Sequence, residues 1–294
     1  MSHKAGFVNI VGNPNVGKST LINALMGERL SVVTFKAQTT RHRIMGIYNE
    51  DDFQIVFSDT PGVLQPNYKL QESMLTFSKS ALVDADILLY VTDVVEVPDK
   101  NNDFVEKVEQ LKVPIFLLIN KVDLSDQEKL GDLVDKWKTI MPQAEIIPIS
   151  AAQKFNLDYL MKRIKSLLPE ASPYFGKDQW TDKPARFFVT EIIRGKILLY
   201  YSEEVPYSVE VAVEEFKEED HKIFIRAVIY VERESQKGII IGKGGLALKK
   251  VATESRHELE HFFNKKIFLE TYVKVDKDWR SSDKELHNFG YELD

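Results

Sequence analysis

The sequence predicts an α/β protein with two domains: a first domain with a mixed, mostly parallel sheet, and a smaller α/β domain after it. Three observations lead to this prediction. The chain has 294 residues, which is enough for about two domains. Its first half alternates apolar strands with helices, as sheets covered on both faces do. After residue 184 the order of the expected elements changes.

The first domain is predicted over residues 1–172. Its strands are expected to pair in two ways, parallel and antiparallel. They are expected at residues 7–11, 43–48, 53–57, 87–91, 115–119 and 146–149. The second and third are joined by a short polar turn at 49–52, which predicts an antiparallel hairpin in an otherwise parallel sheet. The fourth and fifth lack polar alternation, which is typical of strands buried between helices. Helices are expected at 19–26 and 157–168.

A proline-rich stretch follows the last of these helices. Pro169-Glu170-Ala171-Ser172-Pro173 interrupts the helical pattern, and no new periodicity begins before Pro184. We therefore predict a linker over residues 173–184.

Residues Gly12 to Ser19 match the pattern GxxxxGK[ST] of a phosphate-binding loop, or P-loop, between a strand and a helix. The glycines let the loop wrap so that backbone N–H groups point at phosphate oxygens. Lys18 is placed to reach the β- and γ-phosphates, and the Ser19 hydroxyl to bind Mg²⁺. The predicted phosphate-binding residues are Gly12, Asn13, Pro14, Asn15, Val16, Gly17, Lys18, Ser19 and Thr20. A glycine-rich turn without a ligand is the alternative for this motif taken alone.

Four further segments are expected near the same ligand. They are Thr39-Thr40, Asp59-Thr60-Pro61-Gly62, Asn120-Lys121-Val122-Asp123 and Ser150-Ala151. Each follows a predicted strand or lies in a loop at the same edge of the sheet, and open α/β sheets bind ligands at the carboxyl ends of their strands. A polar loop is the alternative for any one segment, but their order along the chain favours a nucleotide site.

Two of these segments suit a metal ion and a γ-phosphate. Asp59 can hold the Mg²⁺ shell together with Ser19. A hydroxyl from Thr39 or Thr40 can complete that shell when a triphosphate is bound. The Gly62 amide can meet the γ-phosphate.

The other two segments suit guanine. Asp123 can accept hydrogen bonds from guanine N1–H and N2–H₂, which adenine does not offer in that arrangement, so discrimination is expected to be large. Asn120 can bond the base edge, and the stem of Lys121 can cover its face. The Ala151 amide, next to Ser150, can reach O6.

These five elements in this order resemble the GTPase superfamily, which implies a P-loop GTPase domain that binds GTP or GDP with Mg²⁺. Small signalling GTPases carry a water-orienting glutamine directly after the glycine that corresponds to Gly62. This chain has Val63 at that position. We therefore expect slow hydrolysis, or water placed by backbone, metal or partner groups.

In related GTPases an asparagine at the position of Asn15 coordinates K⁺; the alternative is a P-loop residue without that role. The resemblance assigns catalysis to Lys18, Thr40 and Asn15.

Beyond residue 184 the expected order is helix, strand, strand, short helix, GxxG loop, helix, strand. The loop Gly242-Lys243-Gly244-Gly245 joins two helices and leads into an apolar stripe that includes Val251 and Leu259. This order resembles a type II KH domain, a module that binds single-stranded RNA, over residues 185–294; a lone GxxG is otherwise a tight turn. The resemblance implies that RNA is bound by Gly242, Lys243, Gly244, Gly245 and Lys249.

The charge of the chain differs by region. The whole chain carries −6, yet residues 233–280 hold eleven Lys and Arg against seven Asp and Glu, a net charge of +4. A basic region within an acidic chain suits an RNA-binding surface, although an ordinary solvated face is the alternative. There is no cysteine and no window of about 18 apolar residues. The lack of cysteine fits a reducing cytosol, so we expect a cytoplasmic protein. Residues 1–4 run directly into the first predicted strand, so we expect no signal peptide.

One further motif, His257-Glu258-Leu259-Glu260-His261, matches the HExxH pattern of zinc proteases. On a helix both histidines face away from the apolar stripe, and no third ligand follows. We therefore do not expect a zinc protease.

A GTPase domain followed directly by a KH domain resembles the bacterial Era family over nearly the whole chain, and the stretches Gln38–Arg43 and Val231–Gly238 add to the match. The resemblance implies a GTP-hydrolysing ribosome-assembly factor that binds 16S ribosomal RNA near its 3′ end and assists maturation of the 30S subunit. It also implies peripheral association with the inner face of the cell membrane, although the sequence shows no anchor, and we expect a monomer. The alternative is a passive RNA chaperone in which GTP is a structural ligand.

Overall fold

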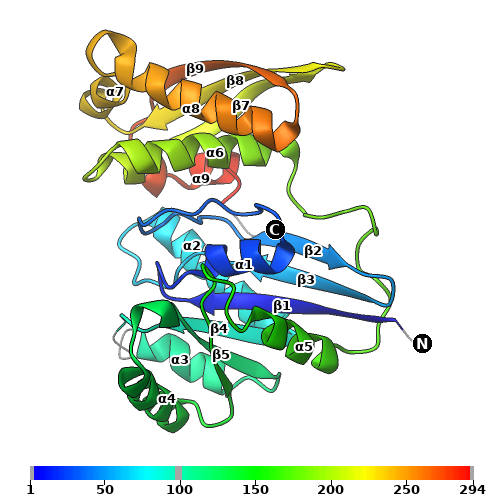
Figure 1. Cartoon of the computed structure of the whole chain (residues 1–294). Coiled ribbons are helices and arrows are strands. Elements are labelled where there is room, and N and C mark those ends of the chain that lie inside the picture. Colours follow the sequence, from blue (N-terminus) through cyan, green and yellow to red (C-terminus); the bar gives the residue numbers. More distant parts are fainter. Residues whose placement is uncertain (1–2, 97–100, 292–294) are drawn as a thin grey trace. The chain divides into compact units, whose positions relative to one another are not determined.

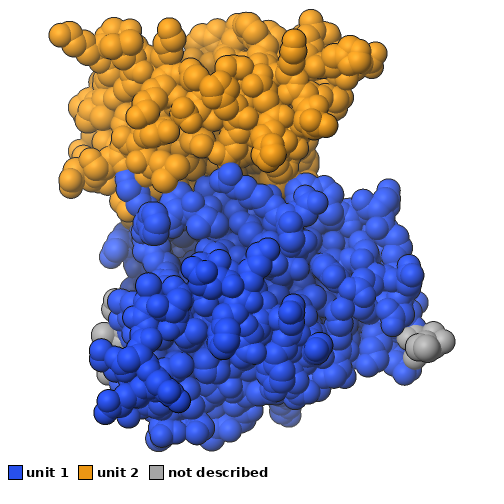
Figure 2. Space-filling model, viewed as in Figure 1, with its two compact units in different colours: residues 1–67, 71–182, 293 blue, residues 68–70, 183–292, 294 orange. Residues whose placement is uncertain are grey.

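The structure, a computed structural model, describes residues 3–96 and 101–291 (Figure 1). The chain divides into two compact units, which Figure 2 colours separately. The first holds the residues up to 182, and the second those from 183 on, with residues 68–70 grouped with the second. Each unit has a hydrophobic core of its own.

The first unit is built on a six-stranded sheet in the order β2-β3-β1-β4-β5-β6. The strands are β1 (Lys4–Gly12), β2 (Ile44–Asn49), β3 (Phe53–Asp59), β4 (Ile87–Asp93), β5 (Ile115–Asn120) and β6 (Glu145–Pro148). Neighbours pair in parallel except β2 and β3, which form the predicted antiparallel hairpin. The prediction of a mixed, mostly parallel sheet is confirmed. Every residue of β3, β4 and β5 is buried, as their continuous apolar runs require.

Helices cover both faces of this sheet (Figure 1). They are α1 (Lys18–Met26), α2 (Lys69–Val83), α3 (Asn102–Glu109), α4 (Gln127–Ile140) and α5 (Leu157–Leu167), with a 3₁₀ turn at Val122–Leu124. Helices α2, α3 and α4 share a core cluster with β4 and β5, in which Phe104 and Trp137 are buried. Helices α1 and α5 lie on the opposite face. The carboxyl ends of β1, β3, β5 and β6 therefore meet at one edge of the sheet.

The segment expected to be a linker packs along this unit over much of its length. The Ile47 N–H of β2 donates to the Trp180 carbonyl at 2.9 Å, and Thr181 forms a β-bridge with Gly46. The Gln54 side chain accepts from two backbone N–H groups, those of residues 174 and 175. Because β2 is an edge strand of the sheet, it offers unpaired backbone groups that this segment satisfies.

The second unit has the element order expected of a type II KH domain. It consists of α6 (Ala185–Tyr200), β7 (Glu210–Glu218), β8 (Lys222–Val231), α7 (Glu234–Ile241), α8 (Leu246–Phe263) and β9 (Lys266–Val275), with short 3₁₀ turns at Val205–Ser208 and Lys243–Gly245. The sheet order is β7-β8-β9, with β7 antiparallel and β9 parallel to β8. Its core includes Ile193 of α6, Ile225 of β8 and Leu259 of α8.

Beyond β9 the structure adds elements that the sequence did not predict. These are a 3₁₀ turn at Trp279–Ser281 and the short helix α9 (Asp283–Asn288). The indole N–H of buried Trp279 donates to the Ser208 carbonyl at 3.0 Å, and the Tyr291 hydroxyl donates to Glu210 at 2.6 Å. These contacts attach the last described residues to the start of β7. No helix formed by the described residues is long and apolar enough to cross a membrane.

Candidate functional site

The P-loop connects β1 to α1 in a conformation that requires glycine. Gly12 has φ 146° and Gly17 has φ 96°, both in the region that favours glycine. A Cβ on Gly12 would lie 2.1 Å from the Val91 carbonyl oxygen, and one on Gly17 would lie 2.3 Å from the Asn120 amide nitrogen. Helix α1 begins at Lys18, directly after the loop. The predicted strand–loop–helix arrangement is therefore present.

The side chain of Lys18 is folded back onto the loop. Its Nζ donates to the carbonyls of Gly12 at 2.9 Å and Asn13 at 2.7 Å. Burial lowers the pKa of Lys18 to about 8, because it disfavours the charged ammonium, while the carboxylates of Asp59 and Glu96 partly oppose this shift. An arriving phosphate would add a negative charge in direct contact with this ammonium, whose hydrogen bonds are made to backbone carbonyls.

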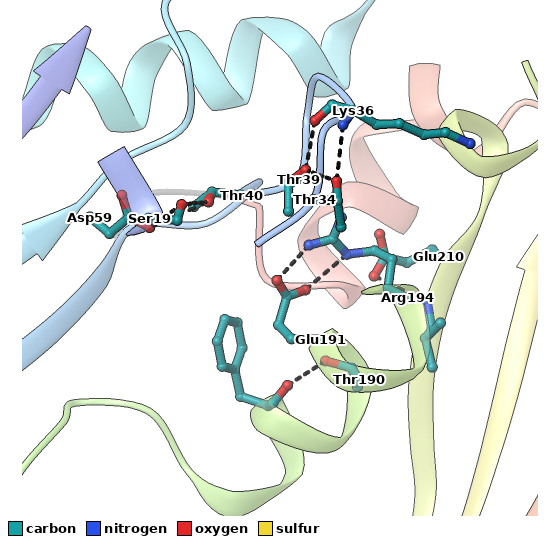
Figure 3. Close-up of polar contacts among 12 residues, drawn as sticks. Ser19, Thr34, Lys36, Thr39, Thr40, Asp59, Thr190, Glu191, Arg194 and Glu210 are labelled. Carbon is teal, nitrogen blue, oxygen red and sulfur yellow. Dashed lines mark hydrogen bonds and ion pairs between the residues drawn. The ribbon is translucent and has the colours of Figure 1, made fainter. Parts of the chain in front are cut away.

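Ser19, Thr40 and Asp59 form a compact cluster beside the loop, in which Thr40 and Asp59 are buried and Ser19 is half-buried (Figure 3). The Ser19 hydroxyl donates to Asp59 Oδ2 at 2.9 Å and lies 2.9 Å from the Thr40 hydroxyl. Thr40 donates to the same carboxylate oxygen at 3.3 Å. Burial raises the pKa of Asp59, and its other oxygen, Oδ1, is buried without a hydrogen-bond partner. Two hydroxyls and a carboxylate with an unused oxygen are the ligand types that Mg²⁺ prefers.

Thr39 takes a different place in the same loop. Its hydroxyl lies 2.6 Å from that of Thr34 and donates to the Lys36 carbonyl at 2.7 Å (Figure 3). Of the two threonines that the sequence offered for the metal shell, the structure brings Thr40 to Ser19 and Asp59.

Asn120 is buried between two segments of the site. Its Nδ2 donates to the Val16 carbonyl at 2.8 Å, and its Oδ1 accepts the Ala151 N–H at 2.9 Å. The amide of Ala151, expected to reach guanine O6, is thus already engaged, and the neighbouring Ala152 borders the cavity instead. One N–H of the Asn120 amide is left to reach a base edge.

Lys121 and Asp123 lie at the mouth of the site. The Lys121 ammonium donates to the Asn15 carbonyl at 2.6 Å and pairs with Asp93 at 2.5 Å, so its stem runs across the P-loop. The carboxylate of Asp123 is exposed and accepts the Ser150 hydroxyl at 2.5 Å. Asp123 is therefore accessible to a base that would cover it.

A single cavity of about 470 Å³ connects these segments. The predicted residues that line it are Pro14, Asn15, Gly17, Lys18, Ser19, Thr20, Thr39, Thr40, Thr60, Gly62, Asn120, Lys121, Asp123 and Ser150. The predicted residues that lie behind this lining are Gly12, Asn13, Val16, Asp59, Pro61 and Ala151. Four loop segments far apart in the sequence therefore meet the P-loop at one hollow.

Some residues of the site were missed by sequence reasoning. The loop residues Val33 and Phe35 also border the cavity, and Phe35 is 98% exposed. An apolar run in a polar loop was the signal that could have identified them. Behind the P-loop, Asn13 hydrogen-bonds with Glu96 and Asn101, for which the sequence pattern gave no signal.

In the second unit the GxxG loop joins α7 to α8 as predicted. Gly242, Gly244 and Gly245 have φ values of 70°, 61° and 77°, so the loop turns sharply before α8 begins. Lys243 and Lys249 are exposed at the start of α8. The N-terminus of α8 lies beside these two lysines, and the N-terminus of a helix favours anions.

The HExxH motif on α8 does not form a metal centre. His257 and His261 are exposed, and Glu258 pairs with Lys196 at 2.6 Å. Among the described residues, no group of three or more His, Cys, Asp or Glu side chains could hold a metal ion.

Two family models match this chain. The model described as "50S ribosome-binding GTPase" matches residues 7–121, and the "KH domain" model matches residues 204–280. The chain is 42% identical to GTPase Era of Staphylococcus haemolyticus, over 98% of this chain and 97% of that relative. It is also 42% identical to GTPase Era of Alkaliphilus metalliredigens, over 99% of this chain and all of that relative.

The chain belongs to the Era family of GTPases. As an Era GTPase it hydrolyses GTP, and the predicted enzyme class is confirmed.

Solved Era structures share the whole fold. A crystal structure of Era in complex with MgGDPNP and nucleotides 1506–1542 of 16S ribosomal RNA has a TM-score of 0.94 and 40% identity, covering 99% of this chain and all of that one. A variant of Aquifex aeolicus Era bound to GDP and AlF₄⁻ matches with the same TM-score, identity and coverage. The prediction of a P-loop GTPase domain followed by a KH domain is confirmed.

Proposed function

We propose that this Era GTPase binds GTP with Mg²⁺ in the cavity of its first unit. We further propose that it binds 16S ribosomal RNA near the 3′ end through its second unit and assists 30S maturation. The single observation that carries the proposal is that the P-loop and all four downstream segments border one cavity large enough for a nucleotide. A buried Asp59 oxygen without a partner, next to two hydroxyls, supports the metal.

Each part of a GTP molecule has a set of residues to receive it. The P-loop N–H groups and Lys18 receive the phosphates. Ser19, Thr40 and Asp59 hold Mg²⁺, with Thr39 in the adjoining loop; the ion, when bound, neutralises charge that develops on the phosphates. Guanine lies against the Lys121 stem, with its edge toward Asn120, Asp123 and Ser150. Ala152, which borders the cavity where Ala151 does not, completes this side of the site.

The catalytic residues of this proposal are Lys18, Thr40 and Asn15. The Val63 side chain is 3% exposed and belongs to the core, so it orients no water. Asn15 is exposed at the cavity with φ 66°, and its side chain can ligate a monovalent cation beside the phosphates. We assign that cation as K⁺, whose charge would replace the arginine finger of other GTPases.

RNA binding is assigned to the GxxG loop, with Gly242 to Gly245 clamping the backbone and Lys249 adding charge. The solved relative bound to nucleotides 1506–1542 of 16S ribosomal RNA supports the choice of RNA. The exposed lysines beside a helix N-terminus support phosphate contact.

The deciding experiment measures binding of a 16S 3′-end oligonucleotide by fluorescence anisotropy at fixed salt. Lys243→Asp combined with Gly244→Asp places two carboxylates against phosphate, and Asp tolerates the positive φ of Gly244 better than most residues. We expect affinity to fall at least about 100-fold, with GTP affinity unchanged. Wild-type RNA affinity in a double variant that still melts cooperatively would refute this assignment.

Lys222→Glu combined with Lys266→Glu is the matched control. These exposed lysines are register partners at the end of β8 farthest from α7, and we expect a much smaller loss of RNA affinity. The same titrations with GDP and with a GTP analogue test the alternative of a passive chaperone, which predicts equal RNA affinity in both states. Acceleration of GTP hydrolysis by 30S subunits would favour the coupled enzyme.

We infer two further properties. The chain is a cytoplasmic monomer, and light scattering after gel filtration would test its oligomeric state. We also infer peripheral association with the inner face of the cell membrane, which flotation with anionic vesicles would test.

A further inference from the structure

Asn101 is at the N-cap position of a helix, but its side chain forms hydrogen bonds with other segments. It is the residue before α3, where asparagine commonly caps the first turn, yet its side chain makes no capping hydrogen bond. Its backbone is left-handed, with φ 63° and ψ 45°. Its Nδ2 donates to Asn13 Oδ1 at 2.6 Å and to the Val63 carbonyl at 3.1 Å. One amide thus connects the P-loop to the residue that follows Gly62.

The P-loop side of this connection is fixed in orientation. The Asn13 Nδ2 donates to Glu96, so its Oδ1 is the atom presented to Asn101. Glu96 in turn accepts the Thr92 hydroxyl at 2.9 Å, and its backbone N–H donates to Asp93 at 2.8 Å. Asn13 is only 5% exposed, so water does not compete freely for these bonds.

On the other side, both backbone groups of Val63 are held. Its N–H donates to the Gly12 carbonyl at 3.1 Å, and its carbonyl accepts from Asn101. Gly62, directly before it, lies so close to the P-loop that a Cβ there would be 2.7 Å from Pro14. The backbone that faces the γ-phosphate position is thereby held by two hydrogen bonds, one to Gly12 and one from Asn101.

We propose that Asn101 is a positioning residue for GTP hydrolysis: by bridging Asn13 and the Val63 carbonyl, it holds the Gly62–Val63 backbone in register with the P-loop. The proposal rests on the nucleotide site proposed above. This positioning role is important because the Val63 side chain cannot place water. The rate of hydrolysis therefore depends more strongly on the alignment of the Gly62–Val63 backbone. Displacement of a reacting group by about 1 Å can cost about 100-fold in rate.

The test compares two variants of Asn101. Asn101→Gly removes the amide without straining a positive φ, and Asn101→Asp keeps the size but turns an oxygen toward two acceptors. For both we expect single-turnover GTP hydrolysis to slow at least about tenfold, while the Kd for GDP changes less than about threefold. GDP serves as the reference because the clamped backbone faces the γ-phosphate position.

Asn156→Gly is the matched control. Asn156 precedes α5 with the same φ of 63°, makes no capping bond, and donates to the Pro148 carbonyl at 3.0 Å. We expect this variant to lose comparable thermal stability and to hydrolyse GTP at the wild-type rate.

The outcomes separate cleanly. Wild-type hydrolysis in a cooperatively melting Asn101→Gly or Asn101→Asp variant would overturn the proposal. So would an equal fall in GDP affinity and hydrolysis, or an equal slowing in Asn156→Gly, since either would indicate a scaffold role. Failure of the wild-type chain to bind GTP would instead refute the proposed nucleotide site itself.

Discussion

The Asn120 amide donates to the Val16 carbonyl across 2.8 Å, so a residue of the base-recognition segment is bonded directly to the P-loop. The same amide accepts the Ala151 N–H at 2.9 Å. Asn120 is 2% exposed, and both the Val16 carbonyl and the Ala151 N–H lose a hydrogen-bond partner if it is removed. This side chain therefore connects the base-binding part of the cavity to the phosphate-binding part, in addition to the Lys121 bond to the Asn15 carbonyl.

Asn120→Ala is expected to weaken GDP and GTP binding equally, by at least about tenfold, because unpaired buried groups cost about 1–3 kcal/mol each. Titration with a fluorescent GDP analogue measures this. Gln143→Ala, which removes an exposed amide bond to the Glu109 carbonyl, is the control and should bind normally. Unchanged GDP affinity in Asn120→Ala would show that the P-loop does not depend on this bond.

Asp123→Asn is expected to shift base preference from guanine to xanthine. Xanthine replaces the N2–H₂ donor with a carbonyl, which an asparagine N–H can meet and a carboxylate cannot. We expect the ratio of GTP to XTP affinity to fall at least about 100-fold, as sites built around a specific donor discriminate strongly. Calorimetric titration with both nucleotides measures this, with Asp126→Asn, at the start of α4, as the control. A retained preference for GTP would remove Asp123 from base recognition.

The lowered pKa of Lys18 predicts that nucleotide affinity depends on pH. In the free chain Lys18 loses its proton near pH 8, whereas bound phosphates favour the ammonium and raise its pKa. Binding therefore takes up a proton above about pH 8, and affinity falls as pH rises, by up to about tenfold per pH unit. Below that pH this group contributes no slope.

Titrations of GDP between about pH 7 and 9.5 at constant salt would reveal this slope. Calorimetry in buffers of different ionisation enthalpy would count the proton. Lys18→Met should bind more weakly with a flatter profile. A flat wild-type profile would contradict the assignment of the low pKa to Lys18.

The sequence identified the cavity because its signals are local. A strand, a glycine-rich loop and Lys18 at the start of a helix need no knowledge of distant residues, and the segments at Asp59 and Asp123 follow buried strands in the same way. Asn101 could not be identified from such local signals. In sequence it is a polar residue before a helix, and its partner Asn13 lies 88 positions away.

Two other differences have the same physical origin. The segment around Trp180 has the composition of a linker, but the exposed edge of β2 gives its backbone partners. The 3₁₀ turn at Trp279 and α9 are too short to show periodicity, and contacts such as the indole bond to Ser208 hold them in place.

Replacing Na⁺ with K⁺ is expected to accelerate GTP hydrolysis by the wild-type chain, and Asn15→Ala to abolish that acceleration. The reason is the exposed Asn15 side chain at the cavity, which can ligate a cation beside the phosphates. Single-turnover rates in the two salts at equal ionic strength measure the effect. Basal turnover should lie within a few orders of magnitude of the roughly 10⁻⁴ s⁻¹ of unassisted GTPases. Equal rates in both salts would exclude the K⁺ role.

Val63→Ala is expected to lower the stability of the fold without slowing GTP hydrolysis appreciably. The side chain is buried in the core cluster with α2, α3 and α4, so losing two methyl groups should lower the free energy of unfolding by about 2 kcal/mol. The backbone bonds to Gly12 and Asn101 do not involve the side chain, and hydrolysis under single-turnover conditions should stay within about threefold of wild type. Val105→Ala, in the same cluster, is the control for stability alone. Loss of most hydrolysis with intact GDP affinity in Val63→Ala would show that the side chain itself takes part in the reaction.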